Sequence, residues 1–378
     1  MAHILFITHW YPTTSNPVSG IFIREHARAA ALFHKVSIIH IIGINKTNSQ
    51  VENVVDGSLT VYRLNYPKPI IPRTGWLYRF FGARCIFQEL IRTHNRPDLI
   101  HANVYSSSDL AYLLGKTFHC PAVLSEHASV YPRNLLSVPQ LSYYRYFMNK
   151  LGLIMPVSVD LQHHMEKAGF RGPFKVIPNA VDTMLFHPAT LMPISDEQPI
   201  IILHVAMLQP IKGTAYLLEA FAKLRKMDFN CVLWIVGDGP ERQRLRELAE
   251  NLHITPSVSF LGIQSKGEIA DLMRQADLFA LTSLWENQPV ALIEAMASGL
   301  PVIAPAIGGI PEIVRPENGL LFDPGNVDNL VEKLSEMITH MKDFSPAESA
   351  RYAQDSFGLQ AIGKRFADVY EQLLTKAH

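Results

Sequence analysis

Residues 283–299, SLWENQPVALIEAMASG, place two acidic side chains around the start of a predicted helix. Pro289 suits the first position of a helix and Gly299 the position just past its end, so we expect a helix over about residues 289 to 298. The N–H groups of its first turn, at residues 290–292, have no acceptor within the helix. They form a positive end that suits a phosphate group.

Glu286 precedes this helix and Glu294 lies on it, about 7.5 Å along the axis from Pro289 at a rise of 1.5 Å per residue. One carboxylate can therefore meet a group on each side of a diphosphate bound at the helix start. Carboxylates bind pairs of hydroxyl groups well, because they accept two charge-assisted hydrogen bonds. Ribose and a hexose both offer such pairs. Two glutamates at this spacing also arise by chance, so the neighbouring motifs decide the interpretation.

Two further loops follow predicted strands. In the first, Lys212 stands where a loop opens a helix, with Thr214 as the expected N-cap, and its ammonium group can neutralise a phosphate. A solvent-exposed loop lysine is the alternative. In the second, residues 236–240, VGDGP, form a glycine turn between a strand and a helix. Arg242 stands where a dinucleotide fingerprint needs its third glycine, and no P-loop motif occurs in the sequence.

Short apolar runs alternate with amphipathic helical stretches along the whole chain, which indicates a repeated βα pattern. Such runs are typical of strands buried on both faces, so each half is expected to be a parallel sheet covered by helices. A proline-rich polar break lies near residues 183–199, and an apolar stripe at residues 359–373 predicts a final helix that docks on something. The expected strands are 3–8, 35–41, 98–101, 121–125, 174–178, 199–206, 231–237, 257–262, 277–282, 301–304 and 319–322.

Composition limits the class of protein. The chain has 378 residues, 48% apolar and 18% charged, which favours two globular domains and excludes a disordered chain. Its three cysteines form no metal or disulfide pattern, so a reducing, cytoplasmic compartment is expected. No apolar run approaches the ~18 residues of a membrane span, and the first apolar run is predicted to be a strand, not a signal peptide.

The net charge of zero conceals two halves of opposite sign. Residues 1–185 hold 18 basic and 10 acidic residues, a net charge of +8, which leaves 16 against 24, or −8, for residues 186–378. Residues 62–96 are basic and aromatic. Either they contact an anionic membrane peripherally or they form a solvated helix whose aromatic side chains pack on the core, and the sequence leaves both open. Nucleic acid is not expected, because the excess is local and no nucleic-acid-binding motif is present. The stretch contains Arg63, Lys68, Arg73, Arg79, Arg84, Arg92 and Arg96, with Trp76, Tyr78, Phe80 and Phe81 among them and Glu89 as the acidic residue.

These motifs in this order resemble the retaining glycosyltransferases of family 4, which have the GT-B fold. The resemblance covers most of the chain. It implies an α/β protein with two doubly wound, Rossmann-like domains that face a central cleft. Residues 1–185 would bind the acceptor and residues 186–378 a nucleotide-diphosphate sugar, and a last helix at about residues 357–376 would pack back on the first domain. The motifs are residues 176–182 with Phe186 and Pro188, then 212–213, 236–240, 260–262, 286–302 and 308–312.

The resemblance also implies roles for individual residues. Glu294 would bind the ribose hydroxyls, Glu286 the hydroxyls of the donor sugar and Lys212 the diphosphate. Gly20 would belong to a loop that approaches the donor, and His127 would lie at the reaction centre, whereas His101 occupies a position that is more often structural. The remaining donor-binding residues would be Asn287, Gln288, Pro289, Val290 and Ala291 around the sugar and phosphate, and Gly262 and Ile263 beside the base.

One position departs from the family pattern. Met207 stands where the family usually has an arginine a few residues before Lys212 and Gly213. Its loss would remove a charge-assisted contact with phosphate, worth about 1.5–3 kcal/mol if nothing replaces it. Either Arg24, near Gly20, substitutes for it, or the donor binds more weakly.

The chemistry implied is transfer of a hexose with its anomeric configuration kept. No carboxylate is placed as a nucleophile beside the family motifs, so the resemblance implies front-face attack, with the departing diphosphate taking the acceptor's proton. No metal site and no cofactor are expected, and the sequence has no DxD motif. The acceptor would be a glycan or a lipid-linked sugar used in surface polysaccharide assembly, and the donor a UDP- or GDP-sugar. The alternatives are a nucleotide-sugar epimerase and an inactive partner subunit.

Overall fold

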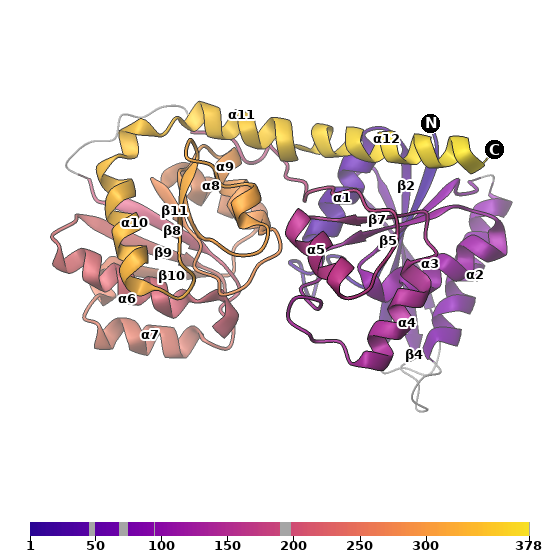
Figure 1. The fold of residues 1–378 in the computed structure, drawn as a ribbon, viewed down its shortest axis with the longest axis horizontal. Coiled ribbons are helices and arrows are strands. Elements are labelled where there is room, and N and C mark those ends of the chain that lie inside the picture. Colours follow the sequence, from indigo (N-terminus) through magenta and orange to yellow (C-terminus); the bar gives the residue numbers. More distant parts are fainter. Residues whose placement is uncertain (45–49, 68–74, 94, 190–197, 378) are drawn as a thin grey trace. The chain divides into compact units, whose positions relative to one another are not determined.

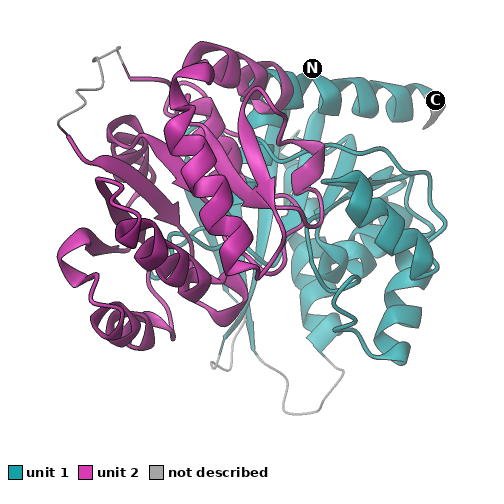
Figure 2. Cartoon of the chain, turned by 60° about the vertical axis from the view of Figure 1, so that its left-hand side comes forward, with its two compact units in different colours: residues 1–180, 359–378 teal, residues 181–358 magenta. Residues whose placement is uncertain are grey.

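The computed structural model describes residues 1–44, 50–67, 75–93, 95–189 and 198–377, and these form two compact units. The first unit contains residues 1–180 together with 359–378, and the second contains residues 181–358 (Figure 2). The chain therefore leaves the first unit at Ala180 and returns to it at Leu359. Within the second unit its two ends lie together, since the Val181 N–H donates to the Phe357 carbonyl at 2.9 Å.

The first unit is built on a seven-stranded sheet in the order β3-β4-β2-β1-β5-β6-β7. All pairs are parallel except β3 with β4, so the expectation of a purely parallel sheet is wrong at this edge. Gly57, at φ 60°, lies between these two antiparallel strands and provides the left-handed residue of a tight turn. The strands are β1 His3–Thr8, β2 Lys35–Ile44, β3 Gln50–Asp56, β4 Leu59–Pro67, β5 Leu99–Asn103, β6 Ala122–Glu126 and β7 Leu153–Pro156.

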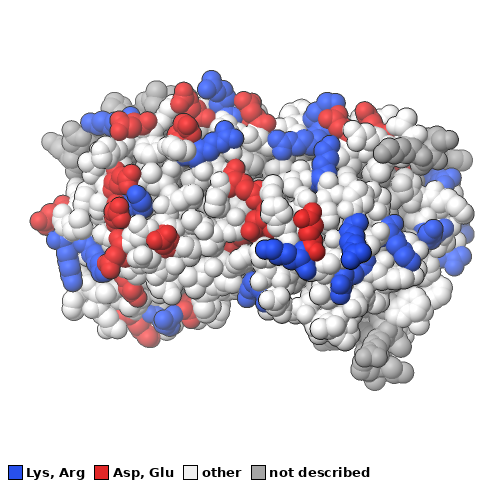
Figure 3. All heavy atoms as spheres, viewed as in Figure 1, with Lys and Arg blue, Asp and Glu red and all other residues white. Residues whose placement is uncertain are grey.

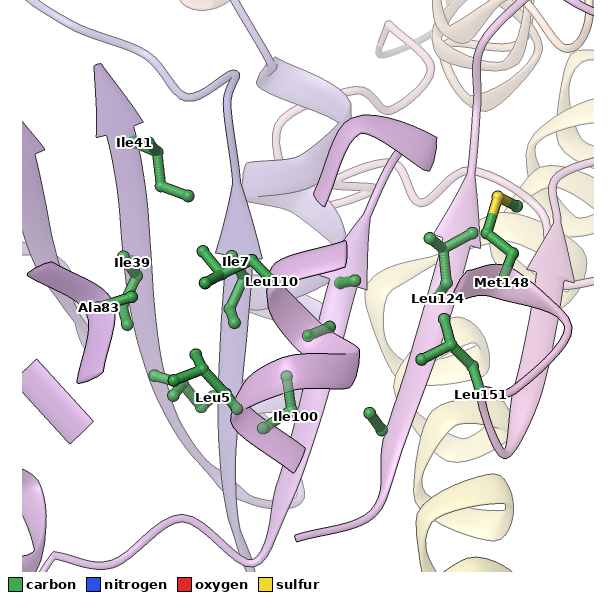
Figure 4. Packing of buried hydrophobic residues seen from close by; sticks show 14 of the residues in the cluster. Leu5, Ile7, Ile39, Ile41, Ala83, Ile100, Leu110, Leu124, Met148 and Leu151 are labelled. Carbon is green, nitrogen blue, oxygen red and sulfur yellow. The ribbon is translucent and has the colours of Figure 1, made fainter. Parts of the chain in front are cut away.

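The central strands of this sheet are buried on both faces, as their apolar runs predict. Figure 4 shows one of these faces, where side chains from neighbouring strands lie together with Leu110 of a covering helix. The helices are α1 Ile21–Ala31, α2 Gly75–Arg92, α3 Ser108–Phe118, α4 Val138–Met148, α5 Val159–Lys167 and α12 Leu359–Ala377, with a 3-10 turn η1 at Tyr105–Ser107.

The final helix, α12, packs on α1 of the first unit (Figure 1). A Cβ atom at Gly363 would lie 2.3 Å from the Ala29 carbonyl oxygen, so only glycine allows the two helices this close. Ile362, Phe366 and Tyr370 are buried in the same core as β1. The apolar stripe in the sequence thus docks α12 on the unit that begins the chain, after the whole second unit has intervened.

The second unit is built on a fully parallel six-stranded sheet in the order β10-β9-β8-β11-β12-β13. Each of its strands falls on one of the predicted apolar runs. They are β8 Ile200–Val205, β9 Cys231–Val236, β10 Val258–Gly262, β11 Leu278–Ala280, β12 Val302–Pro305 and β13 Gly319–Phe322. The helices are α6 Thr214–Lys226, α7 Arg242–Asn251, α8 Lys266–Gln275, α9 Val290–Ala297, α10 Val327–Thr339 and α11 Pro346–Phe357, with 3-10 turns η2 Pro210–Lys212, η3 Thr255–Ser257, η4 Ile310–Glu312 and η5 Met341–Asp343.

One strand expected in the first half is absent. Residues 174–178 form no strand, and Phe174 alone makes an isolated bridge, to Ile154 of β7. Strands β3, β4 and β7 were not expected. Part of the proline-rich break, residues 190–197, lies outside the described residues.

Candidate functional site

In the second unit, the predicted site residues follow the carboxyl ends of neighbouring strands. Lys212 follows β8, Glu286 follows β11, and Gly262 ends β10. Because these strands are parallel, their carboxyl ends share one edge of the sheet, which is where such sheets bind ligands.

Lys212 and Glu286 form an ion pair. The Lys212 Nζ donates to Glu286 Oε1 at 2.6 Å, and the Ser283 hydroxyl donates to the same oxygen at 2.8 Å. The two charged residues are 74 positions apart, and the fold joins them through Gly213, whose φ is 63°. A Cβ at Gly213 would lie 2.1 Å from the Thr282 carbonyl oxygen, so glycine is required for this close approach of the two loops.

Thr214 is not the N-cap of α6, contrary to the sequence expectation. Gly213 occupies that position and provides no side-chain cap. The Thr214 hydroxyl instead lies 3.1 Å from His204 Nε2, while His204 Nδ1 donates to the Ala280 carbonyl at 2.8 Å. Burial lowers the pKa of His204 to about 4, so the ring is neutral and ties β8, β11 and the start of α6 together.

The helix that carries Glu294 begins one residue later than predicted. Pro289 is extended, at φ −73° and ψ 119°, and acts as N-cap, so α9 starts at Val290. Gly299 has a φ of 79° and follows the helix end, as its type predicts. The first turn of α9 has no side-chain cap, and in a helix the N–H groups of this turn, here those of Val290 and Ala291, point toward the helix start.

The segment before α9 packs against the loop that contains Gly308 and Gly309. The Gly309 N–H donates to the Asn287 carbonyl at 2.8 Å, and Asn287 and Gln288 are both buried. A Cβ at Gly308 would lie only 1.8 Å from the Glu286 carbonyl oxygen. The two glycines of the GGIPE motif therefore let one loop lie directly against the backbone of the other.

Glu294 also has a lysine partner, which the sequence patterns did not indicate. Lys266, the first residue of α8, donates through Nζ to Glu294 Oε1. The carboxylate side chain is only 6% exposed and the lysine side chain 20%. Nothing in the spacing of the two residues marks this pair, because it depends on how α8 and α9 lie in the unit. In the loop that leads from β10 to α8, Gly262 has a φ of 71° and Ile263 is 65% exposed.

Met207 is 54% exposed and has no charge to offer at this edge. Arg24, the suggested substitute, lies in the first unit, where its Nε and Nη2 both donate to Asp56 at 2.7 Å. The Tyr11 hydroxyl donates to the same carboxylate at 2.7 Å. The guanidinium fork of Arg24 is therefore already bound within its own unit, and its role toward a phosphate stays a prediction.

In the first unit, Gly20 and His127 lie in loops at the sheet edge. Gly20 is the N-cap of α1 at φ 66°, and a Cβ there would lie 2.4 Å from the carbonyl of Trp10. His127 directly follows β6, and its Nδ1 donates to Asn179 Oδ1 at 3.0 Å. Burial holds the pKa of His127 well below its ordinary value. The ring is thus neutral and held in one orientation.

Glu126 holds the backbone around His127. Its carboxylate accepts the N–H groups of His127 and Ala128 at 2.9 and 2.8 Å, that of Tyr105 at 2.9 Å and the hydroxyl of Tyr131 at 2.8 Å. Complete burial raises the pKa of Glu126 to about 7 despite these donors. Apart from the neighbouring histidine, no feature of the sequence pointed to this arrangement.

His101 is structural, as its position suggested. It is completely buried, with Nδ1 2.7 Å from the Tyr370 hydroxyl of α12 and Nε2 2.8 Å from Ser125 Oγ. It therefore links α12 to the central strands of the first unit.

Of the basic stretch 62–96, Arg63 lies in β4, Arg79, Arg84 and Arg92 lie in α2, and Arg96 lies between α2 and β5. Lys68 and Arg73 lie outside the described residues. Arg79 faces inward, where its Nη2 donates to the buried Asp109 at 2.9 Å. Trp76, Tyr78 and Phe81 are exposed on α2. In Figure 3 acidic side chains gather mainly on the left-hand part, which is the second unit, while basic side chains lie on both parts, in keeping with the opposite net charges of the two halves of the sequence.

Metal sites and membrane-spanning helices are both absent from the described part of the chain. Across residues 1–44, 50–67, 75–93, 95–189 and 198–377, no three His, Cys, Asp or Glu side chains gather so that they could hold a metal ion. Within the same ranges, no helix combines the length and the apolar character that crossing a bilayer requires.

Known proteins match both halves of the chain. Residues 193–353 match the family described as Glycosyl transferases group 1, and residues 19–185 match Glycosyltransferase Family 4. A component of the phosphatidylinositol N-acetylglucosaminyltransferase of Arabidopsis thaliana is 24% identical over 91% of this chain and 76% of that protein. N-acetyl-alpha-D-glucosaminyl L-malate synthase of Bacillus anthracis is 32% identical over 48% of this chain and 47% of that protein.

Solved structures match over nearly the whole length. Sucrose-phosphate synthase from Thermosynechococcus elongatus has a TM-score of 0.78 at 21% identity and covers all of both chains. HepE from Anabaena, in complex with UDP and glucose, has a TM-score of 0.75 at 22% identity over 98% of this chain and all of that chain. These likenesses show that the two Rossmann-like sheets form the GT-B fold.

Proposed function

The chain belongs to the group 1, family 4 glycosyltransferases, which use nucleotide sugars, and on that premise we propose that it transfers a hexose with retention of configuration. The donor would be a UDP- or GDP-sugar and the acceptor a glycan or lipid-linked sugar of surface polysaccharide assembly. One observation carries the proposal. Two carboxylates, Glu286 and Glu294, flank the uncapped start of α9, and each is paired with a lysine.

The two sides of this helix suit the two ends of a nucleotide sugar. The diphosphate would lie at the N–H groups of Val290 and Ala291, with the ammonium group of Lys212 beside it. Glu294 would then accept hydrogen bonds from the ribose hydroxyls and Glu286 from the sugar hydroxyls. Asn287, Gln288 and Pro289 would form the wall around the sugar. Gly262 and Ile263 would line the base, because Ile263 exposes an apolar side chain in the loop between β10 and α8.

In the transfer step one bond breaks, one bond forms and one proton is transferred. The bond between the anomeric carbon and the β-phosphate oxygen breaks, and a bond from that carbon to the acceptor oxygen forms on the same face. The acceptor's proton passes to the departing phosphate oxygen. The protein's part is to stabilise the charge that develops on the diphosphate, through Lys212 and the α9 amides. The first unit would supply the acceptor site, with neutral His127 and the Gly20 loop at the reaction centre.

A donor panel tests this proposal. UDP-, GDP-, ADP- and dTDP-sugars are offered with lipid extracts, and the products are identified by intact mass. Glu294→Ala should lose donor affinity, since the ribose would lose its carboxylate. Glu247→Ala, a change on the exposed face of α7, is the matched control and should bind donor normally. Equal donor affinity in both variants would contradict the ribose assignment.

The same panel separates the alternatives. Conversion of the free donor sugar into its epimer, with no acceptor present, would identify a nucleotide-sugar epimerase. Donor binding without any transfer, hydrolysis or epimerisation would identify an inactive partner subunit, which the uncharged Met207 favours. The family match and the retention of Glu286, Glu294, Lys212 and His127 support the transferase.

We further propose that α2 contacts the cytoplasmic face of a membrane peripherally. Trp76, Tyr78 and Phe81 are exposed near its start, and Arg84 and Arg92 follow on the same helix. Each basic side chain near an anionic leaflet gains about 1 kcal/mol. Replacing both arginines by Gln should weaken co-sedimentation with phosphatidylserine vesicles. The same change at Lys167 and Lys364 is the control, and unchanged vesicle binding by the arginine variant would end this proposal.

A further inference from the structure

The side chain of Lys266 lies between the Glu294 carboxylate and the ring of Phe186. Its Nζ donates to Glu294 Oε1 and lies 5.4 Å from the centre of the Phe186 ring. We infer that Lys266 is a positioning residue for the nucleotide's ribose, and that this chain recognises the ribose through a lysine–glutamate pair rather than through a carboxylate alone. The inference rests on the proposed function of Glu294.

The fold fixes the direction of the lysine side chain. Lys266 is the first residue of α8, and the helix start is held by a capping box. In that box the Ser265 N–H donates to Glu268 Oε2 at 2.7 Å and the Glu268 N–H donates to Ser265 Oγ at 3.3 Å. Phe186 is completely buried, so its ring is a fixed support for the ammonium group. Both contacts of the lysine are therefore made with groups that have little freedom to move.

The pair leaves Glu294 able to accept the ribose. An ionised carboxylate has about four lone-pair sites on its two oxygens, and Lys266 occupies one of them. The two ribose hydroxyls need two more, so lysine and ribose bind together rather than compete. Lys266 bonds Oε1, so Oε2 and the second lone pair of Oε1 can accept the ribose hydroxyls.

Three possible roles of Lys266 predict different results when the lysine is replaced. If Lys266 only stabilised the fold, its loss would lower the melting temperature and leave the preference for ribose unchanged. If it blocked the ribose, its loss would tighten nucleotide binding. If Lys266 positions the carboxylate for the ribose, its loss must weaken binding of the ribonucleotide and reduce the discrimination against the 2′-deoxyribonucleotide.

Titration calorimetry with the nucleoside diphosphate selected by the donor panel, and with its 2′-deoxy form, measures both quantities on the full chain. For Lys266→Met we expect about tenfold weaker binding of the ribonucleotide, the loss of roughly one hydrogen bond to a charged group. The preference over the deoxy form should fall severalfold, the donor KM should rise, and kcat should stay within about twofold. Lys266→Arg should recover most of the affinity. Lys333→Met, on α10 of the same unit, is the matched control and should bind as the wild type.

An unchanged or tighter affinity in Lys266→Met, or an unchanged preference for ribose, overturns the inference. Glu294→Ala keeps this result distinct from failure of the proposed function. If Glu294→Ala loses nucleotide binding and Lys266→Met does not, the carboxylate binds ribose without help from the lysine. If neither variant loses binding, the nucleotide lies elsewhere and both proposals fail. A folded Lys266→Met protein is verified by its thermal unfolding before binding is measured.

Discussion

Acid should unfold the first unit before the second. Burial lowers the pKa of seven histidines in the first unit, and for three of them, His9, His26 and His40, the pKa falls to about 4. In the second unit, among the described residues, His204 is the one histidine with a pKa lowered by burial. A histidine with a lowered folded pKa contributes stability that is complete above its unfolded pKa of about 6.5, and the contribution is lost as the pH falls through about 4.

The size of the difference follows from these shifts. Each spans about 2.5 pKa units, or about 3 kcal/mol at 1.36 kcal/mol per unit. As the pH falls, protonation of His9, His26 and His40 lowers the free energy of unfolding of the first unit by about 10 kcal/mol. Glu126 acts in the opposite direction, because its raised pKa means that protonation between about pH 7 and pH 4.5 stabilises the folded state by about 3 kcal/mol. The net loss of about 7 kcal/mol is comparable to the whole stability of a domain, whereas the second unit loses about 3 kcal/mol.

Limited proteolysis by pepsin, which works in acid, measures this directly. The protein is exposed briefly to pepsin at pH values from 6 to 3.5, and the fragments are assigned by mass. We expect cleavage within residues 1–180 at a higher pH than cleavage within residues 181–358. The His26→Gln variant tests the cause, because the glutamine amide can still donate to the Pro178 carbonyl but cannot gain a proton. That variant should survive to lower pH. Simultaneous cleavage of both units, or earlier cleavage of the second, would refute the reasoning.

Three further changes give sharp expectations. Gly308→Ala should weaken donor binding and cost more than ~1 kcal/mol in unfolding free energy, because its Cβ would meet the Glu286 carbonyl oxygen at 1.8 Å; thermal unfolding and calorimetry measure the two effects. Tyr370→Phe should cost about 1–2 kcal/mol in urea unfolding, since it leaves a buried nitrogen of His101 without its partner. Glu126→Gln should lower kcat more than it raises donor KM, because an amide cannot accept all four donors that hold the loop of His127. A kcat equal to wild type would show that the loop needs no such anchor.

The sequence predicted the buried strands well and the edge strands of the first sheet poorly. Strand β1 lies at the expected residues and β12 within one residue of them, because strands buried on both faces are continuous apolar runs. The edge strand β3, QVENVVD, is largely exposed and carries polar residues, so it lacks such a signal. Strand β4 overlaps the start of the basic stretch 62–96, which was interpreted by its charge, and β7 has only four residues. A pattern of parallel βα units therefore did not predict the antiparallel pair of β3 and β4.

The candidate site was predictable where one local segment contains it. Glu286, Glu294 and the start of α9 lie within a few turns of one another, so spacing and capping rules place them within a residue of their observed positions. The lysine partners are different. Lys212 was found through a motif, but its ion pair with Glu286 depends on two loops meeting at Gly213. Lys266 belongs to none of the motifs recognised in the sequence, so only the fold brings it to Glu294.

The pairing of both glutamates with lysines bears on the missing arginine at Met207. The four side chains Lys212, Glu286, Lys266 and Glu294 have no net charge together, so a diphosphate entering this edge meets neither strong repulsion nor strong attraction from them. Direct neutralisation must then come from the side of Lys212 that faces away from Glu286 and from the free amides of α9. Because the α9 amides are fixed by the backbone, this source of positive potential survives the loss of an arginine side chain. A methionine at position 207 is therefore compatible with a working donor site, at the cost of the affinity that a second cation would add.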